Sequence, residues 1–256
     1  MMLTMNAFAI IGKRRGVGKT ELGLRIVKYL KDRNIPVVVI KHTHKIDLDN
    51  KDSLKYFSIG ADNVITVSSD FMLTMSKASF DVEYFSKGVD GIVVVEGFKA
   101  SNLPKIIVAR TLDDLSFSFN GNVIAVIVPE DLIGKAKETF PGSNVLPISD
   151  LDALNRLFED IALKALISIL PNIDCKVCGY STCLDFAKSI IDGVNSIYKC
   201  IKYQGDVVVK VNKLKLNLGK FPQEILKNIL IAYLKTLKGT PEKIDEVEIY
   251  IKTVTN

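Results

Sequence analysis

A short apolar segment, a glycine-rich loop and an amphipathic helix follow one another near the N-terminus and constrain the fold of this 256-residue chain. They are AFAII at 7–11, GKRRGVG at 12–18 and KTELGLRIVKYLKDRN at 19–34. A strand, a loop and a helix in this order point the backbone N–H groups of the loop and of the helix N-terminus at one place, which suits a phosphate group. The alternative interpretation is a glycine turn that happens to precede a lysine.

Further runs rich in Val and Ile recur up to about residue 150, and helical patterns lie between them. The runs are AFAII, PVVVIK, VITVSS, GIVVVEG, KIIVAR and VIAVIVP. Short continuous apolar runs are typical of strands covered on both faces, as in parallel sheets. The alternation predicts an α/β fold with three layers and a mostly parallel sheet.

The pattern changes after residue 170. SDLDALNRLFEDIALKALISIL at 149–170 predicts a closing helix, capped by Ser149 or Asp150 and followed by Pro171. We therefore predict one domain at 1–170 and a small α+β unit at 171–256. In the second unit we expect a half-exposed hairpin at 206–218, an amphipathic helix at 221–239 ended by Gly239, and a strand at 246–252.

The glycine-rich loop predicts a nucleotide site. Lys19 is expected to reach the β- and γ-phosphates, and Thr20 to hold Mg²⁺. The usual spacing is G-x4-G-K-[ST], whereas five residues separate Gly12 from Gly18. Arg14 and Arg15 fill this longer loop, and either neutralise phosphate charge or form a solvated bulge. The residues expected around the phosphates are Arg15, Gly16, Val17, Gly18, Lys19, Thr20 and Glu21.

Two other strand ends carry polar residues, where open α/β sheets bind ligands. His42 and His44, the only histidines, follow one strand together with Asp47 and Asp49. They form either a metal- or phosphate-contacting loop or an exposed polar loop. Glu96 ends the strand of GIVVVEG and is expected to share the Mg²⁺ with Thr20 and Asp47. The predicted catalytic residues are Lys19, Thr20 and Glu96.

The four cysteines all lie in the last third, with the spacing C-x2-C-x4-C-x16-C at Cys175, Cys178, Cys183 and Cys200. In a cytosolic protein, cysteines clustered in this way are more often metal ligands than disulfides. Four thiolates bind either Zn²⁺ or an iron–sulfur cluster. Plain thiols are the remaining interpretation.

Charge and hydropathy exclude several classes of protein. No apolar run reaches the roughly 18 residues that a membrane span needs. The net charge of +5 comes from lysines spread along the chain, which indicates a solvated surface rather than a nucleic-acid interface. The N-terminal segment is apolar before it is basic, opposite to a secretory signal, so we expect a cytoplasmic protein without membrane partners.

The first 170 residues or so resemble the molybdopterin-guanine dinucleotide biosynthesis protein B family, MobB. The resemblance rests on the glycine-rich loop, on IKHTH followed by DLD and KDS, on GADNVITVSS, and on VVVEGFK followed by PKIIVAR. It implies a P-loop NTPase fold, GTP binding with weak hydrolysis, and a homodimer. It also implies a role late in molybdenum- or tungsten-cofactor assembly, with molybdopterin guanylyltransferase or a molybdopterin-carrying protein as partner.

The chain departs from this family at two places. The loop is one residue longer, and Glu21 replaces a common second Thr. The family tends to place an Asp, facing the guanine base, after the strand VIAV. Here Pro129 takes that position, with Glu130 and Asp131 just beyond. We expect Asp131 to meet the base through a shifted loop, and His42 to contact the nucleotide.

The sequence CGYSTCLDFAKSIIDG followed by a distant Cys resembles the small four-cysteine [4Fe–4S] domain of some electron-transfer and corrinoid proteins. The leading hypothesis is therefore a GTP-binding accessory protein of cofactor biosynthesis that also holds a [4Fe–4S] cluster. An alternative is an iron–sulfur redox or cluster-carrier protein that its nucleotide domain gates. A third is a nucleotide-dependent adaptor with structural Zn²⁺.

Overall fold

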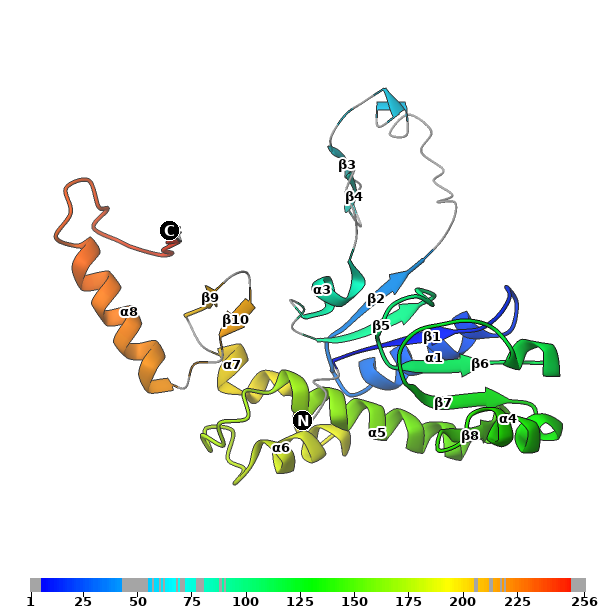
Figure 1. Ribbon diagram of the computed structural model, residues 1–256. Coiled ribbons are helices and arrows are strands. Elements are labelled where there is room, and N and C mark those ends of the chain that lie inside the picture. The colour runs from blue at the N-terminus through cyan, green and yellow to red at the C-terminus, as the bar shows by residue number, and fades with distance from the viewer. Residues whose placement is uncertain are drawn as a thin grey trace, which may run out of the picture.

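A six-stranded parallel sheet forms the centre of the protein (Figure 1). The computed structural model describes residues 6–42, 55–56, 58–59, 61, 63–67, 69, 72–76, 81–87, 89, 91–204, 207–211, 214–216, 218 and 220–249. The strand order is β2-β5-β1-β6-β7-β8, and every neighbouring pair is parallel. The strands are β1 (Ala7–Ile11), β2 (Val37–Lys41), β5 (Ile92–Glu96), β6 (Lys105–Val108), β7 (Val123–Val128) and β8 (Asn144–Pro147). The predicted α/β class is confirmed.

Helices cover both faces of this sheet. One face packs against α1 (Lys19–Lys31) and α5 (Leu151–Ile169), and the other against α3 (Val82–Lys87), η1 (Leu112–Leu115) and α4 (Ile133–Thr139). Successive strand residues alternate between the two cores, so that Phe8 and Ile10 join one and Ala9 and Ile11 the other. The short helix η2 (Glu130–Leu132) links β7 to α4. These are the three layers that the sequence predicts.

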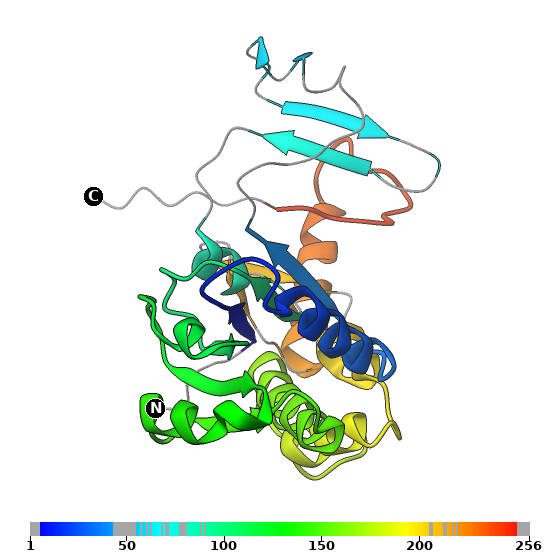
Figure 2. The same cartoon turned by 90° about the vertical axis from the view of Figure 1, so that its right-hand side faces the viewer.

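The strand predicted from VITVSS does not belong to the central sheet. β3 (Asn63–Val67) pairs antiparallel with β4 (Met72–Ser76) in a separate two-stranded sheet. This hairpin rises away from the main sheet in both views (Figures 1 and 2). Ile65 and Val67 are 61 % and 71 % exposed, so a run of Val and Ile here does not indicate burial on both faces. The expectation of a parallel buried strand at this place is wrong.

The helix α5 begins and ends where the sequence predicts. The Asp150 side chain accepts a hydrogen bond from the Ala153 backbone N–H at 2.9 Å and so caps the first turn. Leu170 is the C-cap, and Pro171 follows. The buried side of α5 carries Leu154, Leu157, Phe158, Ile161, Ala162, Ala165, Leu166 and Ile169.

The cysteine-containing segment packs directly on α5. It contains α6 (Cys183–Ile191), η3 (Ile197–Lys199) and α7 (Ile201–Gln204). Phe186 and Ile190 of α6 belong to the same hydrophobic core as Phe8 of the sheet and Leu166 of α5. The core therefore runs continuously across residue 170. The boundary between 1–170 and 171–256 stays a prediction from sequence texture.

The remaining C-terminal elements agree only in part with the predictions. β9 (Val209–Val211) and β10 (Leu214–Leu216) form the expected antiparallel hairpin. The helix α8 (Lys220–Leu234) stands apart from the sheet (Figure 1) and ends before the predicted Gly239. Two threonine hydroxyls donate hydrogen bonds to carbonyls at its C-terminal end: Thr236 Oγ1 to Tyr233 O at 2.7 Å, and Thr240 Oγ1 to Leu234 O at 2.6 Å.

The predicted last strand is not found where the structure describes it. Residues 246–249 have no regular secondary structure, and 250–252 lie outside the described residues. Among the described helices, none has the length and apolar character to cross a membrane. The cytoplasmic location stays a prediction.

Candidate functional site

The glycine-rich loop between β1 and α1 has the backbone that a phosphate site requires. Gly16 and Gly18 have φ angles of 77° and 103°, in the left-handed region that favours glycine. Gly18 is the N-cap of α1, and its carbonyl accepts a hydrogen bond from Leu22 N at 3.0 Å. The free N–H groups of the first helical turn therefore point out of the loop, where an anion would be stabilised.

Thr20 and Glu96 meet beside this loop. Thr20 Oγ1 lies 3.0 Å from Glu96 Oε1 and 2.9 Å from Glu96 Oε2. They come together because β5 is the parallel neighbour of β1, and Ile10 is in register with Glu96. The two residues predicted to share a Mg²⁺ ion are thus adjacent.

A positive charge already lies against this pair. Lys41 ends β2, which is the other neighbour of β5. Its Nζ lies 3.3 Å from Glu96 Oε2 and 3.5 Å from Thr20 Oγ1. The ammonium group occupies the place where a hydroxyl and a carboxylate would hold a metal cation.

Lys19 rests on the loop itself. Its Nζ donates to the backbone carbonyl of Arg14 at 2.7 Å. Burial lowers the pKa of Lys19 from its ordinary value, and the nearby Glu96 carboxylate partly offsets this effect. The Lys19 ammonium is therefore held within the curve of the loop.

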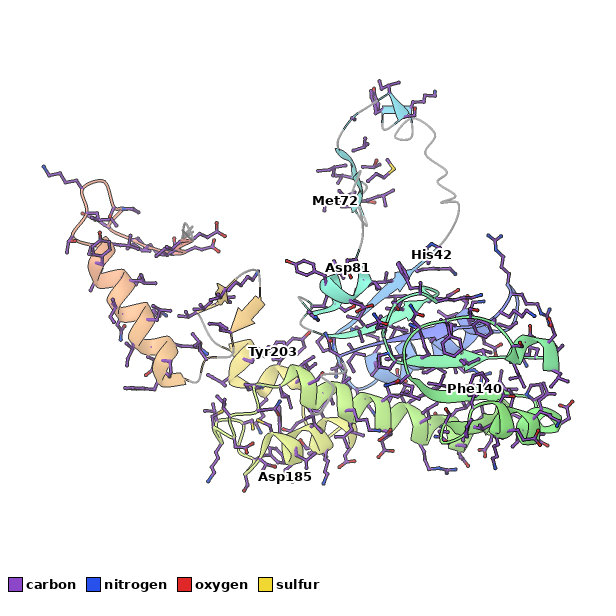
Figure 3. All side chains as sticks on the ribbon, in the orientation of Figure 1. His42, Met72, Asp81, Phe140, Asp185 and Tyr203 are labelled. Atoms are coloured by element: carbon purple, nitrogen blue, oxygen red, sulfur yellow. The ribbon has the colours of Figure 1, made fainter. Side chains whose placement is uncertain are left out.

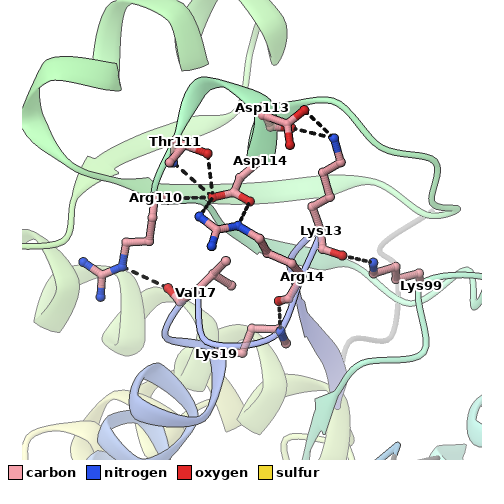
Figure 4. A network of polar contacts seen from close by, with 9 residues as sticks. All are labelled: Lys13, Arg14, Val17, Lys19, Lys99, Arg110, Thr111, Asp113 and Asp114. Atoms are coloured by element: carbon pink, nitrogen blue, oxygen red, sulfur yellow. Dashed lines mark hydrogen bonds and ion pairs between the residues drawn. The ribbon is translucent and has the colours of Figure 1, made fainter.

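A cluster of charged residues closes the other side of the loop (Figure 4). Arg14 Nε lies 2.7 Å from Asp114 Oδ1, and Arg14 Nη2 lies 3.1 Å from Asp114 Oδ2. Arg15 is exposed. The Arg14 guanidinium is therefore paired with a protein carboxylate, and the neutralisation of phosphate charge by either arginine stays a prediction.

Several residues of this cluster could not be predicted from the sequence. Asp114, Asp113, Arg110 and Lys99 all reach the glycine-rich loop with a side chain. The only local signal is TLDD at 111–114, which reads as the start of a helical turn. The partner of Asp114 lies 100 residues away in sequence, and no pattern in one sequence reports such a pairing.

His42 lies at the end of β2, on the side from which the hairpin carrying Met72 rises (Figure 3). Its backbone N–H donates to Glu96 O at 2.9 Å, and its ring packs edge-on against Phe98 at 5.2 Å between centroids. The predicted His42 therefore adjoins Glu96. The other members of that polar group, His44, Asp47 and Asp49, lie outside the described residues.

Asp131 lies in η2 after β7, and its side chain is exposed. Pro129 precedes this turn as its N-cap, and neighbouring Glu130 Oε1 accepts a hydrogen bond from Ser149 Oγ at 3.0 Å. In the sheet, β7 is separated from β1 by β6. Asp131 follows β7 on one side of β1, whereas Glu96 ends β5 on the other side. The contact of Asp131 with a base stays a prediction.

The four cysteines line one pocket at the start of α6. Apolar and aromatic side chains share its wall, and the lining includes Pro171, Tyr180, Phe186 and Ile201. All four thiols are free, and Cys178, Cys183 and Cys200 are buried. Burial raises the pKa of Cys183 and of Cys200.

The backbone around the pocket is shaped by the residues between the cysteines. Asp174, Lys176 and Gly179 have positive φ angles of 44°, 61° and 88°. The Asp174 carboxylate accepts a hydrogen bond from Cys183 N at 2.7 Å and so fixes the first turn of α6. The Thr182 hydroxyl caps the same turn by accepting from Asp185 N at 3.0 Å.

The donor set fits an iron–sulfur cluster. A [4Fe–4S] cluster takes four thiolate ligands, and a partly apolar wall limits its exposure to solvent. In the part of the chain that the structure describes, no three His, Cys, Asp or Glu side chains are grouped to hold one metal ion. The four thiols thus face a common pocket rather than converging on a single point.

Comparisons with known families divide the chain in two. Residues 7–129 match the family described as "Molybdopterin guanine dinucleotide synthesis protein B", MobB. Residues 170–201 match a family described as "Putative Fe-S cluster". The first match contains the glycine-rich loop and Glu96, and the second contains all four cysteines.

Relatives of known name fall into the same two groups. A molybdopterin-guanine dinucleotide biosynthesis adapter protein of Haemophilus influenzae is 33 % identical over 104 residues, covering 37 % of this chain and 58 % of that protein. The adapter protein of Escherichia coli is 30 % identical over 120 residues, covering 43 % and 67 %. A component of the ion-translocating oxidoreductase complex of Buchnera aphidicola (subspecies Baizongia pistaciae) is 35 % identical over 72 residues, covering 28 % and 34 %. The chain thus spans less than two thirds of the Haemophilus and Buchnera proteins.

Solved structures of MobB proteins resemble part of the chain. The crystal structure of Bacillus subtilis MobB has a TM-score of 0.46 and 20 % identity, covering 59 % of this chain and 94 % of that one. A MobB homologue from Bacillus stearothermophilus has a TM-score of 0.45 and 20 % identity, covering 61 % and 98 %. The Escherichia coli relative, matched over two thirds of its length at 30 % identity, decides the assignment. With its loop, its parallel sheet and the family match over residues 7–129, the chain belongs to the MobB family.

Proposed function

We propose that this protein binds GTP and acts as an accessory protein late in molybdenum- or tungsten-cofactor biosynthesis. The observation that carries the proposal is the contact of Thr20 Oγ1 with both oxygens of Glu96, at 3.0 and 2.9 Å, beside a glycine loop that opens a helix. That arrangement serves a nucleoside triphosphate with its metal ion. The adapter relatives are named for molybdopterin-guanine dinucleotide biosynthesis, and this supports a role in that pathway.

Each residue of the loop has a distinct role in this proposal. The backbone from Arg15 to Glu21 binds phosphate oxygens. The Lys19 ammonium has three N–H donors, so it keeps its hydrogen bond to the Arg14 carbonyl while it donates to the β- and γ-phosphates. Thr20 and Glu96 are the residues that would hold Mg²⁺, together with the predicted ligand Asp47. The Lys41 ammonium would move away from Glu96 when the ion binds. Mg²⁺ bound there neutralises charge on the phosphate oxygens.

Hydrolysis by this site is expected to be slow. The Glu96 carboxylate accepts from Thr20 and pairs with Lys41, so it is engaged on the metal side of the site. A carboxylate in that position is not placed to take a proton from an attacking water. We therefore propose a binding protein with at most weak GTPase activity.

Calorimetric titration of the full chain with GTP and Mg²⁺ tests nucleotide binding. Lys19→Ala is expected to abolish binding, whereas Arg25→Ala, an exposed change in the same helix, leaves it unchanged. Equal affinity of Lys19→Ala and the unaltered protein would refute the site. A parallel titration with ATP tests base preference, and tighter binding of ATP than of GTP would overturn the guanine assignment and the role of Asp131.

We further propose that Cys175, Cys178, Cys183 and Cys200 hold a [4Fe–4S] cluster. The single pocket that all four line supports this, as does the family match over residues 170–201. Protein purified without oxygen should contain about four iron and four sulfide per chain, with visible absorption, and Cys183→Ser should lose both. Zinc alone in a colourless protein would replace the cluster with a structural metal site.

The partners follow from the same proposal. We propose a homodimer that meets molybdopterin guanylyltransferase or a molybdopterin-carrying protein. Cells that lack the gene should lose molybdo- or tungsto-enzyme activity, and normal activity of all such enzymes would exclude the pathway. Analytical ultracentrifugation tests the dimer, and a monomer at micromolar concentration would contradict it.

A second candidate function is a redox or cluster-carrier protein gated by nucleotide. One observation favours it: the far ends of α1 and α6 meet through a hydrogen bond from Arg33 to Ile191 O at 2.8 Å. This function requires that the reduction potential of the cluster change when nucleotide binds. A reduction potential that is identical with and without GTP would exclude nucleotide-gated redox function and leave the accessory role as the remaining candidate.

A further inference from the structure

We propose that Asp114 is a positioning residue of the nucleotide site, because its carboxylate holds Arg14 and thereby places the backbone carbonyl on which Lys19 rests. This inference rests on the proposed nucleotide binding. Asp114 lies in η1 after β6 and reaches the loop from the side opposite to Glu96. It would act through Arg14 and Lys19 and would not touch the nucleotide.

The Asp114 carboxylate is completely buried, with 0 % of the residue exposed. A buried charge is costly unless hydrogen-bond donors surround it. Arg14 Nε and Nη2 donate at 2.7 and 3.1 Å. The other donors come from its own turn: Arg110 N at 3.1 Å, Thr111 N at 3.0 Å and Thr111 Oγ1 at 3.0 Å.

These donors keep Asp114 ionised. The Arg14 guanidinium is the largest cause that lowers the pKa of Asp114 far below its ordinary value, against the opposing effect of burial. Three of the five donors fix the carboxylate to the turn at residues 110–114, and the other two belong to the glycine-rich loop. One side chain therefore joins the glycine-rich loop to the turn that follows β6.

The contact between Asp114 and Arg14 also affects Lys19. The Arg14 residue whose side chain binds Asp114 offers its carbonyl to Lys19 Nζ at 2.7 Å. Any shift of Arg14 would displace this carbonyl and with it the ammonium group. A displacement of about 1 Å at a reacting or binding group can cost about a hundredfold in function.

Two other carbonyls of the loop are bound in the same way (Figure 4). Lys99 Nζ donates to Lys13 O at 2.9 Å, and Arg110 Nε donates to Val17 O at 3.0 Å. Carbonyl oxygens that pointed into the site would repel a phosphate. Because these carbonyls are paired with cationic side chains, the N–H groups of the loop are left to face the anion.

The unusual length of the loop explains why such a contact would be needed. Five residues separate Gly12 from Gly18, one more than the usual spacing, and Arg14 is one of these five. A longer loop has more conformations to restrict before it binds. The charged hydrogen bonds between Arg14 and Asp114 select one of them before nucleotide arrives.

The test compares Asp114→Asn with Asp113→Asn, two adjacent carboxylates of different burial. Titrations of the full chain with GTP and with GMP are made for each. Asp114→Asn should weaken GTP binding about tenfold to a hundredfold. Its effect on GMP should be less than about threefold, because GMP lacks the phosphates that Lys19 reaches. Asp113→Asn, which loses only an exposed pair with Lys13, should change both affinities less than about twofold.

The ratio of the two affinities separates positioning from a general loss of structure. An equal loss for GTP and GMP, or no loss at all, would overturn the role of Asp114. If Asp114→Asn does not fold, Arg14→Gln removes the same pair from its exposed end and should give the same ratio, with partial recovery in Arg14→Lys. If the unaltered protein binds no GTP, the proposed function fails instead, and the comparison shows which has failed.

Discussion

Arg33, just beyond the end of α1, donates a hydrogen bond from Nε to the carbonyl of Ile191, the last residue of α6, at 2.8 Å. α1 begins at Lys19 in the glycine-rich loop, and α6 begins at Cys183 in the cysteine pocket. Two helices that each start at a candidate ligand site are thus joined at their far ends. The Arg33 guanidinium also stacks on the ring of Tyr29, 3.8 Å from its centroid.

Replacement of Arg33 tests the strength of this junction. Arg33→Met should lower the free energy of unfolding by about 1–2 kcal/mol, because it loses the hydrogen bond to Ile191 O and the contact with the Tyr29 ring. Urea unfolding followed by circular dichroism measures the change. Arg25→Met is the control, since its exposed pair with Glu21 should contribute less than about 0.5 kcal/mol. Equal stability of the two variants would mean that the junction contributes nothing.

The continuous core predicts that damage in α6 reaches the sheet. Ile190 is fully buried, and Ile190→Ala should cost about 2–5 kcal/mol. Hydrogen exchange of amides in β1 and β5 should show the same loss of free energy, because these strands share one core with α6. Val194→Ala, at a position that is 71 % exposed, is the control. Unchanged protection in β1, beside lost protection in α6, would show two independent cores.

Gly97, directly after Glu96, is predicted to tolerate no side chain. Its φ is 95°, and a Cβ would lie 3.0 Å from the Cβ of His42. Gly97→Ala should therefore destabilise the protein by about 1–3 kcal/mol. Gly134→Ala is the matched control, because Gly134 lies in α4 with open space around it and should gain about 0.5–1 kcal/mol from helix propensity. Thermal unfolding of both variants measures the two effects. A loss of stability in Gly134→Ala would show that Gly134 is not a valid control.

The buried Lys105 predicts a pH dependence of stability. Burial lowers its pKa to about 8. Its Nζ donates to Ser101 O and Ser101 Oγ, both at 2.8 Å. In the unfolded chain the pKa of a lysine is about 10.4, so between pH 8 and about 10 the unfolded state binds more protons. The contribution of Lys105 to the free energy of unfolding therefore rises with pH in that window and is constant below it.

Comparison with Lys105→Met isolates this effect from other groups that titrate at high pH. The difference in stability between the two proteins, from urea unfolding at a series of pH values, should shift in favour of the unaltered protein as the pH increases from 8 to about 10. The total shift should approach about 3 kcal/mol, at roughly 1.4 kcal/mol per pKa unit. A difference that does not vary with pH would show that Lys105 titrates normally.

The sequence predicts much of the fold because its signals are local. β1, β2, β5, β6 and β7 follow from their Val- and Ile-rich runs, and the capping of α5 follows from Asp150. β8 was missed since Asn144–Pro147 is short and ends in proline. β4 could not be predicted because its sequence, MLTMS, contains no run of Val and Ile. The place of β3 depends on which strand it pairs with, and periodicity does not report pairing.

The candidate sites show the same division. The proximity of Thr20 and Glu96 could be predicted, because the helix after β1 begins beside Thr20 and Glu96 ends β5, at the edge where parallel strands end. The cysteines could be predicted from their spacing. The contact of Asp114 with the loop could not be predicted, because its partner is an arginine 100 residues away. The shared core of α5 and α6 depends likewise on the packing of two helices that the composition change at residue 170 separates.

The packing of α5 has a consequence for where the chain can be divided. This helix presents apolar residues both to the sheet and to α6. A chain cut after residue 170 would keep α5 but expose to water the apolar side chains that α6 covers. Apolar surface uncovered in this way favours aggregation. The nucleotide part and the cysteine segment are therefore expected to be produced in soluble form only when they are expressed together.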